Sequence, residues 1–235
     1  MKINLLMPVL ATPVQWLKQA VESVIYQNHP NFNLIIVDDN NPVGPITEFL
    51  SDISKQHELI RVVRKDANEG IASALNFGIR HCHGDLIVRM DADDIAHADL
   101  LKSHDKYFSL HADRHICGVQ IRLFNEQRQW VSNHPLQITR SLASLMPGHW
   151  FVNHPGIAYR HSAINAIGGY NDTPSTLAED YSLWVKFLIS GYTIYNMEEV
   201  LINYRVHPKS FSFAPDRKAP EWHDFLMAQK KLLDE

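Results

Sequence analysis

The stretch Leu86-Ile-Val-Arg-Met-Asp-Ala-Asp-Asp94 decides how the fold of this chain is interpreted. It follows a Gly-Asp turn, begins with five residues of mainly apolar character and runs directly into Asp91, Asp93 and Asp94. A short apolar run with such boundaries is typical of a buried central strand in a parallel sheet, although its length also fits a piece of helix. Open α/β sheets bind their ligands beyond the carboxyl ends of the strands. The sequence therefore predicts a binding site at these aspartates.

Three neighbouring carboxylates repel one another, and the repulsion disfavours their charged forms unless a cation lies among them. A divalent metal ion removes this repulsion, and a set of oxygen ligands suits magnesium or manganese. The alternative is an Asp-rich turn that caps the next helix and binds no ligand. The stretch by itself leaves both interpretations open.

Composition places the chain among ordinary globular proteins. Its 235 residues are 45% hydrophobic and 20% charged, which suits one large domain or one and a half. A formal net charge of -4 offers no basic footprint, so we expect no nucleic-acid partner. Cys82 and Cys117 are too few for a disulfide framework and lack the spacing of metal ligands. We expect both to be buried thiols in a reducing compartment.

The sequence shows no sign of a membrane-spanning or secretory segment. No apolar run approaches the roughly 18–20 residues that cross a bilayer, and Met1-Lys2 leads directly into a strand instead of a signal peptide. We therefore expect a cytoplasmic protein. Peripheral association with the inner face of the membrane is compatible with the same sequence.

Strands and helices alternate over the first hundred residues, which indicates βαβ units and a mostly parallel sheet. We expect strands at 3–9, 32–37, 59–63 and 86–90, and helices that contain 13–25, 46–53 and 71–79. Thr12 as N-cap, Pro13 at the first helical position and Gln15 in a capping box begin the first helix. The loop at 8–12 contains no glycine, which argues against a dinucleotide-binding or Walker loop.

The second half follows a different pattern. We expect a helix at about 100–110, a hairpin of 116–124 with 129–131, a helix at 136–146, a strand at 156–160, a short helix at 162–167, a helix that begins at 178–180, strands at 192–197 and 201–206, and a helix from about Glu221. The chain has no internal repeat, low-complexity tract or linker. We therefore expect one domain over residues 1–235.

Several short motifs follow one another in an order typical of one enzyme family. They are Ile36-Val-Asp-Asp39, Asn68-x-Gly70 with Asn76-x-Gly78, Asp91-Ala-Asp-Asp94, Gly168-Gly-Tyr170, Ala178-Glu-Asp-Tyr-Ser-Leu-Trp184 and Tyr204-Arg-Val-His207. Over about residues 3–212 the chain resembles the inverting family-two glycosyltransferases of GT-A fold. The resemblance implies an α/β fold with a mostly parallel central sheet flanked by helices.

The resemblance also implies a nucleotide-binding half at about residues 1–95. Pro8 and the loop after it would lie against the base, and Asp39 would accept a hydrogen bond from the uracil ring N–H, because an ionised carboxylate only accepts. Asn68 belongs to the same donor-binding set, and Asp91 would lie toward the ribose. For Asp38 and Asp39 the alternative is an Asx turn at the end of a strand.

For the metal, the resemblance points to Asp93 in the family's DxD element. Asp93 would ligate Mn²⁺ or Mg²⁺, and the cation would stabilise the diphosphate leaving group. His207 is either a further ligand or a structural histidine at a strand end. Asp94 is either a second ligand or a helix cap. Further candidates for diphosphate contacts are Arg64, Lys65 and Arg205, although single charged side chains are usually solvated.

The acceptor half, at about residues 96–212, would supply the catalytic base. The resemblance assigns this role to Asp180, which would take the proton of the attacking acceptor hydroxyl; a helix N-cap is the alternative. Glu179 and His154 would lie on the acceptor side. Trp150 would stack on a sugar ring there, unless it is simply core.

The chain departs from the family pattern at two places. Many relatives carry arginine where this chain has Leu75, so a phosphate contact from that position must come from elsewhere. Asn40-Asn-Pro42 replaces a Gly-Ser type of turn after the first acidic pair.

The implied function is transfer of a hexosyl or N-acetylhexosaminyl group from a nucleotide-diphosphate donor, a UDP-sugar, to a glycan or lipid-linked glycan. Synthesis of lipopolysaccharide, capsule or another surface polysaccharide would be its purpose. The alternatives are a sugar-1-phosphate nucleotidyltransferase and a non-catalytic module that binds nucleotides or glycans. The C-terminal tail and helix, residues 213–235, complete the domain, and the segment 208–220 would cover the donor or touch a membrane surface.

Overall fold

The computed structural model describes residues 1–124, 129–173, 178–208 and 220–235. The strands in these ranges are β1 (Ile3–Val9), β2 (Phe32–Asp38), β3 (Ile60–Arg64), β4 (Leu86–Arg89), β5 (Ile95–Ala96), β6 (Ile116–Phe124), β7 (Gln129–Val131), β8 (Gln137–Ile138), β9 (Ala158–Arg160) and β10 (Ile194–Arg205). The helices are α1 (Val14–Ile25), α2 (Pro45–Gln56), α3 (Ile71–Ile79), α4 (Leu100–Leu110), α5 (Arg140–Leu145), α6 (His161–Ala166), α7 (Glu179–Ile189) and α8 (Pro220–Asp234).

The strands form one mixed sheet with the order β3-β2-β1-β4-β9-β6-β10-β5, while β7 pairs with β6 and β8 with β10. Strand β1 lies inside its parallel part, between β2 and β4, and every residue of β1 is buried. Successive side chains of a strand point to opposite faces. Leu6 accordingly belongs to the core on one face, and Leu5 and Met7 belong to the core on the other.

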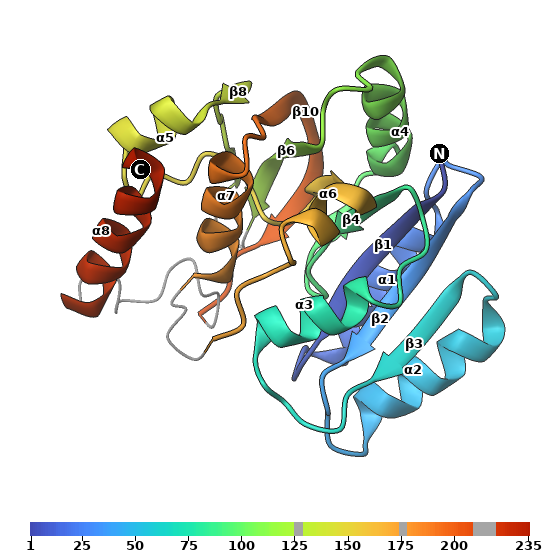
Figure 1. Cartoon of the computed structure of the whole chain (residues 1–235). Helices are drawn as coiled ribbons and strands as arrows, with labels where there is room; N and C mark the ends of the chain where they lie inside the picture. The colour runs from blue at the N-terminus through green and yellow to red at the C-terminus, as the bar shows by residue number, and fades with distance from the viewer. Residues whose placement is uncertain (125–128, 174–177, 209–219) are drawn as a thin grey trace.

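Helices cover both faces of the sheet. Buried residues of α3, α6 and α7 pack on the face of Leu6, and those of α1, α2 and α4 pack on the face of Leu5. A strand covered on both sides reads as a continuous apolar run, which explains the sequence of β1. Figure 1 shows α2 and β3 at one end of the molecule and α5 and α8 at the other.

The sheet changes character at β4. This strand runs parallel to β1 but antiparallel to β9, and β9 is in turn antiparallel to β6. Strand β10 is parallel to β6 and ends antiparallel to the short β5. The central parallel strand predicted at 86–90 is confirmed as β4.

The structure also confirms the hairpin, since β6 and β7 pair antiparallel. The predicted cap of the first helix is wrong. Pro13 has an extended ψ of 128°, so the first helical residue is Val14, and Pro13 takes the N-cap position without a side-chain hydrogen bond. Thr12 therefore does not cap the helix.

Two predicted boundaries in the second half are also wrong. The helix expected at 136–146 is only α5, because Gln137 and Ile138 pair with β10 and Thr139 then caps the helix through a 3.2 Å bond from the Leu142 N–H. The strands expected at 192–197 and 201–206 are one strand, β10. Register shifts between Asn196 and Val200 accommodate the residues that looked like a break.

The cysteines and the helices can be compared with what the composition suggests. Cys82 and Cys117 are free and buried, as predicted. Within the described ranges, no helix combines the length and the apolar character that a bilayer crossing requires. The segment 208–220, for which a covering role is expected, lies almost wholly outside the described residues.

The close approach of α3 to the sheet depends on Gly78. A Cβ at this position would overlap a methyl group of Leu6 and would lie 2.8 Å from Cγ2 of Val37. Gly78→Val should therefore lower the free energy of unfolding by at least about 2 kcal/mol, measured by urea denaturation, because overpacking forces neighbours out of position. Ser51→Val on the exposed side of α2 is the control. Equal losses in the two variants would contradict the tight packing of α3.

Candidate active site

A cavity of about 920 Å³ opens where β1, β4 and β10 end. Seven of the ten predicted site residues line it, and they are Asp91, Asp93, Trp150, His154, Glu179, Asp180 and His207. They come from the end of β4, the loop before β9, the start of α7 and the end of β10. The cavity therefore brings together residues that lie more than a hundred positions apart in the sequence.

Arg89 holds Asp91 at the end of β4. Its Nη1 donates to Oδ2 of Asp91 at 2.6 Å, and its Nη2 donates to Oδ1. Arg89 is only 3% exposed. Burial raises the pKa of Asp91, the Arg89 guanidinium opposes this rise, and repulsion from Asp93 adds to it. Arg89 is not among the predicted site residues, although a single charged residue inside an apolar strand is a signal in the sequence.

Asp93 and His207 meet inside the cavity. Nε2 of His207 lies 2.9 Å from Oδ2 of Asp93, and both side chains are partly exposed. The indole of Trp16 lies against the imidazole, with ring centroids 5.0 Å apart. Two side chains predicted to bind the same metal are thus adjacent.

The donor set around Asp93 fits a metal that takes few protein ligands. In the described part of the chain, no group of three or more His, Cys, Asp or Glu side chains is arranged to hold an ion alone. Mg²⁺ is commonly bound by one or two carboxylates together with substrate phosphates and water. The Asp93 carboxylate facing the cavity matches that pattern, whereas the imidazole of His207 is a less typical ligand for Mg²⁺ or Mn²⁺.

Asp94 is not the cap of the next helix, and its role as a second metal ligand stays a prediction. It is fully buried, it does not line the cavity, and helix α4 has Asp99 as its N-cap. Oδ1 of Asp94 instead accepts the backbone N–H of Arg205 at 2.9 Å. Burial raises the pKa of Asp94 well above its ordinary value, and Asp91 and Asp93 add to the rise. Asp94 fastens the end of β10 to the acidic loop.

Asp180 and Glu179 lie in the first turn of α7, where negative charge is favoured by the helix dipole. Oδ2 of Asp180 accepts Nε1–H of Trp150 at 3.0 Å, and Oδ1 accepts the N–H of Tyr181 at 2.7 Å. Ala178 is the N-cap, so the alternative interpretation of Asp180 as an N-cap does not hold. The carboxylate is held in a defined position beside the cavity.

Glu179 is placed between Asp180 and His154. Its Oε1 lies 3.6 Å from Nδ1 of His154, whose Nε2 lies 2.8 Å from the hydroxyl of Tyr170. Burial raises the pKa of Glu179 to about 7, repulsion from Asp180 adds to the rise, and Arg89 opposes it. Burial lowers the pKa of His154 well below its ordinary value.

A second polar group lines the cavity, and sequence reasoning missed it. His134, on the segment after β7, places Nε2 3.0 Å from Oδ1 of Asn153, whose Nδ2 donates to Oγ of Ser132 at 3.1 Å. All three line the cavity. Burial lowers the pKa of His134, and the bond to Asn153 opposes this. No motif marks these residues, because the fold alone brings them together.

Three predicted donor residues do not line the cavity. Pro8 is buried in β1, and exposed Asn68 forms a turn by accepting the N–H of Gly70 at 3.0 Å. Asp39 is 2% exposed, and its Oδ1 lies 3.0 Å from Nζ of Lys65, an ion pair without the alignment of a hydrogen bond. Nucleotide contacts by these residues stay a prediction.

The turn after β2 organises the loop that follows β1. Asp38 accepts the N–H and Nδ2–H of buried Asn41 at 2.9 and 2.7 Å and also binds Arg64. Asn41 in turn accepts the N–H of Ala11 at 2.8 Å, and Ala11 lines the cavity. Arg64, a candidate for a diphosphate contact, is thus engaged with Asp38, as Lys65 is with Asp39.

Residues 5–168 match the family described as glycosyl transferase family 2. The chain belongs to glycosyl transferase family 2. This membership, which covers more than half of the chain, confirms the predicted family and enzyme class. It sets aside the two alternatives, a nucleotidyltransferase and a non-catalytic module.

Relatives of this glycosyltransferase include bacterial enzymes. An uncharacterized glycosyltransferase of Haemophilus influenzae is 30% identical over 210 residues, which cover 88% of this chain and 76% of the relative. The UDP-Gal:alpha-D-GlcNAc-diphosphoundecaprenol beta-1,3-galactosyltransferase of Escherichia coli is 26% identical over 193 residues, which cover 81% and 68%.

Solved structures confirm the GT-A fold. S. aureus TarS 1-349 in complex with UDP-GlcNAc matches with a TM-score of 0.70 at 16% identity, covering 88% of this chain and 59% of that chain. The mannosyltransferase PcManGT from Pyrobaculum calidifontis, in complex with GDP-Man and Mn²⁺, matches with a TM-score of 0.71 at 16% identity, covering 98% and 69%. The glycosyltransferase thus spans about three fifths of the length of the TarS chain.

The raised pKa of Glu179 predicts a pH-dependent cost to stability. Its ordinary value is 4.5 and its folded value about 7, so between these values the folded state binds more protons than the unfolded state. The free energy of unfolding then falls as the pH rises through this window. Glu179→Gln removes the cost, and we expect it to stabilise the protein by about 2 kcal/mol at pH 8 relative to its effect at pH 5.

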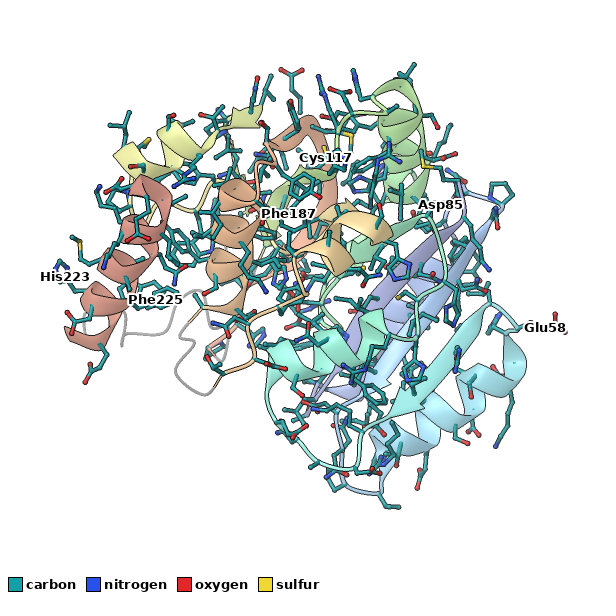
Figure 2. All side chains as sticks on the ribbon, in the orientation of Figure 1. Glu58, Asp85, Cys117, Phe187, His223 and Phe225 are labelled. Atoms are coloured by element: carbon teal, nitrogen blue, oxygen red, sulfur yellow. The ribbon has the colours of Figure 1, made fainter. Side chains whose placement is uncertain are left out.

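Urea denaturation of wild type and variant at the two pH values measures this difference. Exposed Glu58, labelled in Figure 2 at the edge of the molecule far from α7, supplies the control Glu58→Gln. If Glu179→Gln changes the free energy of unfolding equally at pH 5 and pH 8, the pKa of Glu179 is not raised in the folded protein.

Proposed function

We propose that this glycosyltransferase transfers a sugar from a UDP-sugar to a hydroxyl group of a glycan, in a metal-assisted reaction that inverts the anomeric centre. One observation carries the proposal. A single cavity is lined both by the adjacent pair Asp93 and His207 and by Asp180. Departure of a diphosphate and activation of a hydroxyl are the two tasks of the reaction, and each group suits one of them.

On the donor side, Asp93 and His207 would hold Mn²⁺ or Mg²⁺. A bound divalent cation supplies charge stabilisation for a diphosphate leaving group, worth several kcal/mol in a transition state. Asp91 is committed to Arg89 through two hydrogen bonds. We therefore assign Asp91 to the ribose side, where it can accept a hydroxyl hydrogen bond without leaving Arg89, since a carboxylate has about four acceptor positions.

On the acceptor side, Asp180 would be the general base. Both of its oxygens accept one N–H each, so free lone pairs remain for an acceptor hydroxyl. Glu179 and His154 would bind other hydroxyls of the acceptor, and the polar group of Ser132, His134 and Asn153 extends the same wall. Inversion requires attack from the face opposite the leaving group, which is consistent with a base that is separate from the metal ligands.

The uridine donor is supported by relatives. The E. coli enzyme is named for UDP-Gal, and TarS was solved with UDP-GlcNAc. The same fold accepts GDP-Man in the mannosyltransferase, so fold alone leaves the base open. In our proposal Asp39 accepts the uracil N–H and Pro8 and Asn68 lie nearby, which requires the Asp39–Lys65 ion pair to share its carboxylate with the base.

Surface polysaccharide synthesis is the proposed setting. The relatives include an O-antigen biosynthesis glycosyltransferase, WbnJ of E. coli, which is 26% identical over 197 residues. In the same proposal the acceptor is a lipid-linked glycan and the enzyme works at the inner face of the membrane. The chain is a single domain with a donor half at 1–95, an acceptor half at 96–212 and a tail at 213–235. The diphosphoundecaprenol acceptor in the name of the galactosyltransferase supports the lipid-linked acceptor.

Nucleotide release from a panel of UDP- and GDP-sugars, with and without Mn²⁺, tests the proposal. We expect UDP release from a UDP-sugar only with the metal present. Asp93→Ala should abolish it, because the cation would lose its carboxylate ligand. The exposed carboxylate variant Asp52→Ala is the matched control. Full turnover in EDTA would refute the metal requirement. Nucleotide release from GDP-sugars alone would refute the proposal of a UDP-sugar donor.

Asp180→Asn separates the base from donor binding. General-base catalysis is typically worth 10²–10⁴-fold, so sugar transfer should fall by about that factor. Affinity for UDP, measured by calorimetry, should be unchanged, because the diphosphate binds at Asp93. Near-normal transfer by Asp180→Asn would remove Asp180 from the base role.

A further inference from the structure

Asp180 depends on a side chain from another segment for its orientation. The N–H of Tyr181 that binds Oδ1 belongs to the same helix, so this contact is local. The 3.0 Å bond to Oδ2 comes from Nε1 of Trp150, thirty positions earlier in the chain. Trp150 therefore fixes the rotation of the carboxylate relative to the cavity.

The indole of Trp150 is itself held by two helices. It stacks on Trp222 of α8, with centroids 5.7 Å apart and only 11° between the ring planes. It is tilted against Tyr181 of α7, with centroids 5.3 Å apart. Offset-stacked aromatic pairs contribute attraction beyond the burial of their area. The plane of the indole is thus defined by contacts on α7 and α8.

Helix α8 is fastened at its other end. Arg140 of α5 donates Nε to the carbonyl of Leu233 at 2.7 Å and Nη2 to the carbonyl of Leu232 at 3.1 Å. Such bonds satisfy carbonyls that a helix C-terminus leaves without intrahelical partners. Leu233 is buried in the core shared with α7.

Contacts along α8 keep its aromatic side against α7. Phe225 lies 6.3 Å from the ring of Tyr181 and 5.4 Å from that of Trp222. Figure 2 shows Phe225 on the side of α8 toward the molecule and His223 on the outer side. Trp222 is therefore presented to Trp150 by a helix anchored at both ends.

We propose that α8 is a positioning element of the active site, in which Trp222 holds Trp150 and Trp150 holds the Asp180 carboxylate. The inference rests on the proposed role of Asp180 as the base. A base must be kept within a fraction of an ångström of its working position, and a supporting layer of packed side chains provides this. Trp150 and Trp222 are positioning residues, whereas Asp180 is the catalytic residue.

Kinetics distinguish positioning from a general structural role. Trp150→Phe keeps an aromatic ring but removes the N–H donor together with part of the stacking surface, and Trp222→Leu removes the stacking partner. We expect kcat to fall roughly 10-fold in both, as for loss of a hydrogen bond to a charged group, while KM for the UDP-sugar stays within about twofold. Met227→Ala, an exposed position of α8 outside the stack, is the control. Unchanged kcat, or a raised KM alone, would overturn the proposal.

A spectroscopic experiment tests the contact without using activity. The chain has five tryptophans, so a ¹H–¹⁵N spectrum shows up to five indole N–H signals, and Trp150→Phe identifies the one that disappears. Asp180→Asn and Trp222→Leu should each move that signal, because one changes the acceptor and the other removes the stack. A signal that neither variant moves would overturn the proposal.

The two experiments also separate this inference from the proposed function. If Asp180→Asn moves the indole signal but transfers sugar at the normal rate, the contact exists and Asp180 is not the base. If Asp180→Asn abolishes transfer while Trp150→Phe and Trp222→Leu are fully active, the base assignment holds and the positioning role of α8 is wrong.

Discussion

Electrostatic repulsion is the constraint on which the rest of this structure depends. Asp91, Asp93, Glu179 and Asp180 line one cavity, and burial raises the pKa values of Asp91 and Glu179. Such an arrangement needs a compensating positive charge that is itself fixed. Arg89 supplies it from inside the sheet, since its guanidinium binds both oxygens of Asp91 and also lowers the pKa of Glu179. The guanidinium of Arg89 is buried because β4 is a central strand, and its pair with Asp91 offsets the free-energy cost of that burial. Arg89 therefore allows several carboxylates to gather near the end of β4.

The backbone of the same residue joins β4 to the loop before β9. The N–H of Arg89 donates to the carbonyl of Ile157 at 2.8 Å, and its carbonyl accepts the N–H of Gly156 at 2.7 Å. Gly156 has a φ of +80°, and a Cβ there would lie 2.6–2.7 Å from Ile202 and Val119, so this close approach requires glycine. His104 of α4 reaches the carbonyl of the same glycine with Nε2 at 2.8 Å. The loop that carries His154 is consequently fixed to β4, the strand that ends two residues before Asp91.

The sequence was sufficient wherever a local pattern and its environment agreed. The apolar run of β1, the stripe of α1 and the acidic end of β4 all follow from periodicity, and the motif order predicted the family and seven residues of the cavity. The predictions failed where contacts with residues distant in the sequence determine the local structure. Gln137 and Ile138 form a strand because β10 offers them an edge, and Asp94 turns inward because the N–H of Arg205 needs an acceptor. The group of His134 and Asn153 has no local signature at all. Arg89 lies between these two cases. A charged residue in an apolar strand is visible in the sequence, but its pairing with Asp91, two residues later, is not.

The contact between Asp93 and His207 depends on the register in which β5 and β10 pair. Strand β5 pairs with β10 through Asn203 opposite Ile95 and Ile202 opposite Ala96. Continued outward, this register sets Asp93 opposite Arg205, whose Nε donates to the Asp93 carbonyl at 2.9 Å, and His207 lies two residues further along the chain with its Nε2 2.9 Å from the Asp93 carboxylate. A slip of one residue in this register would turn every side chain of β5 to the other face of the sheet and separate the pair. Asp94, by accepting the N–H of Arg205, helps to hold this register. A buried carboxylate that does not line the cavity thus supports the position of the two residues, Asp93 and His207, that meet inside it.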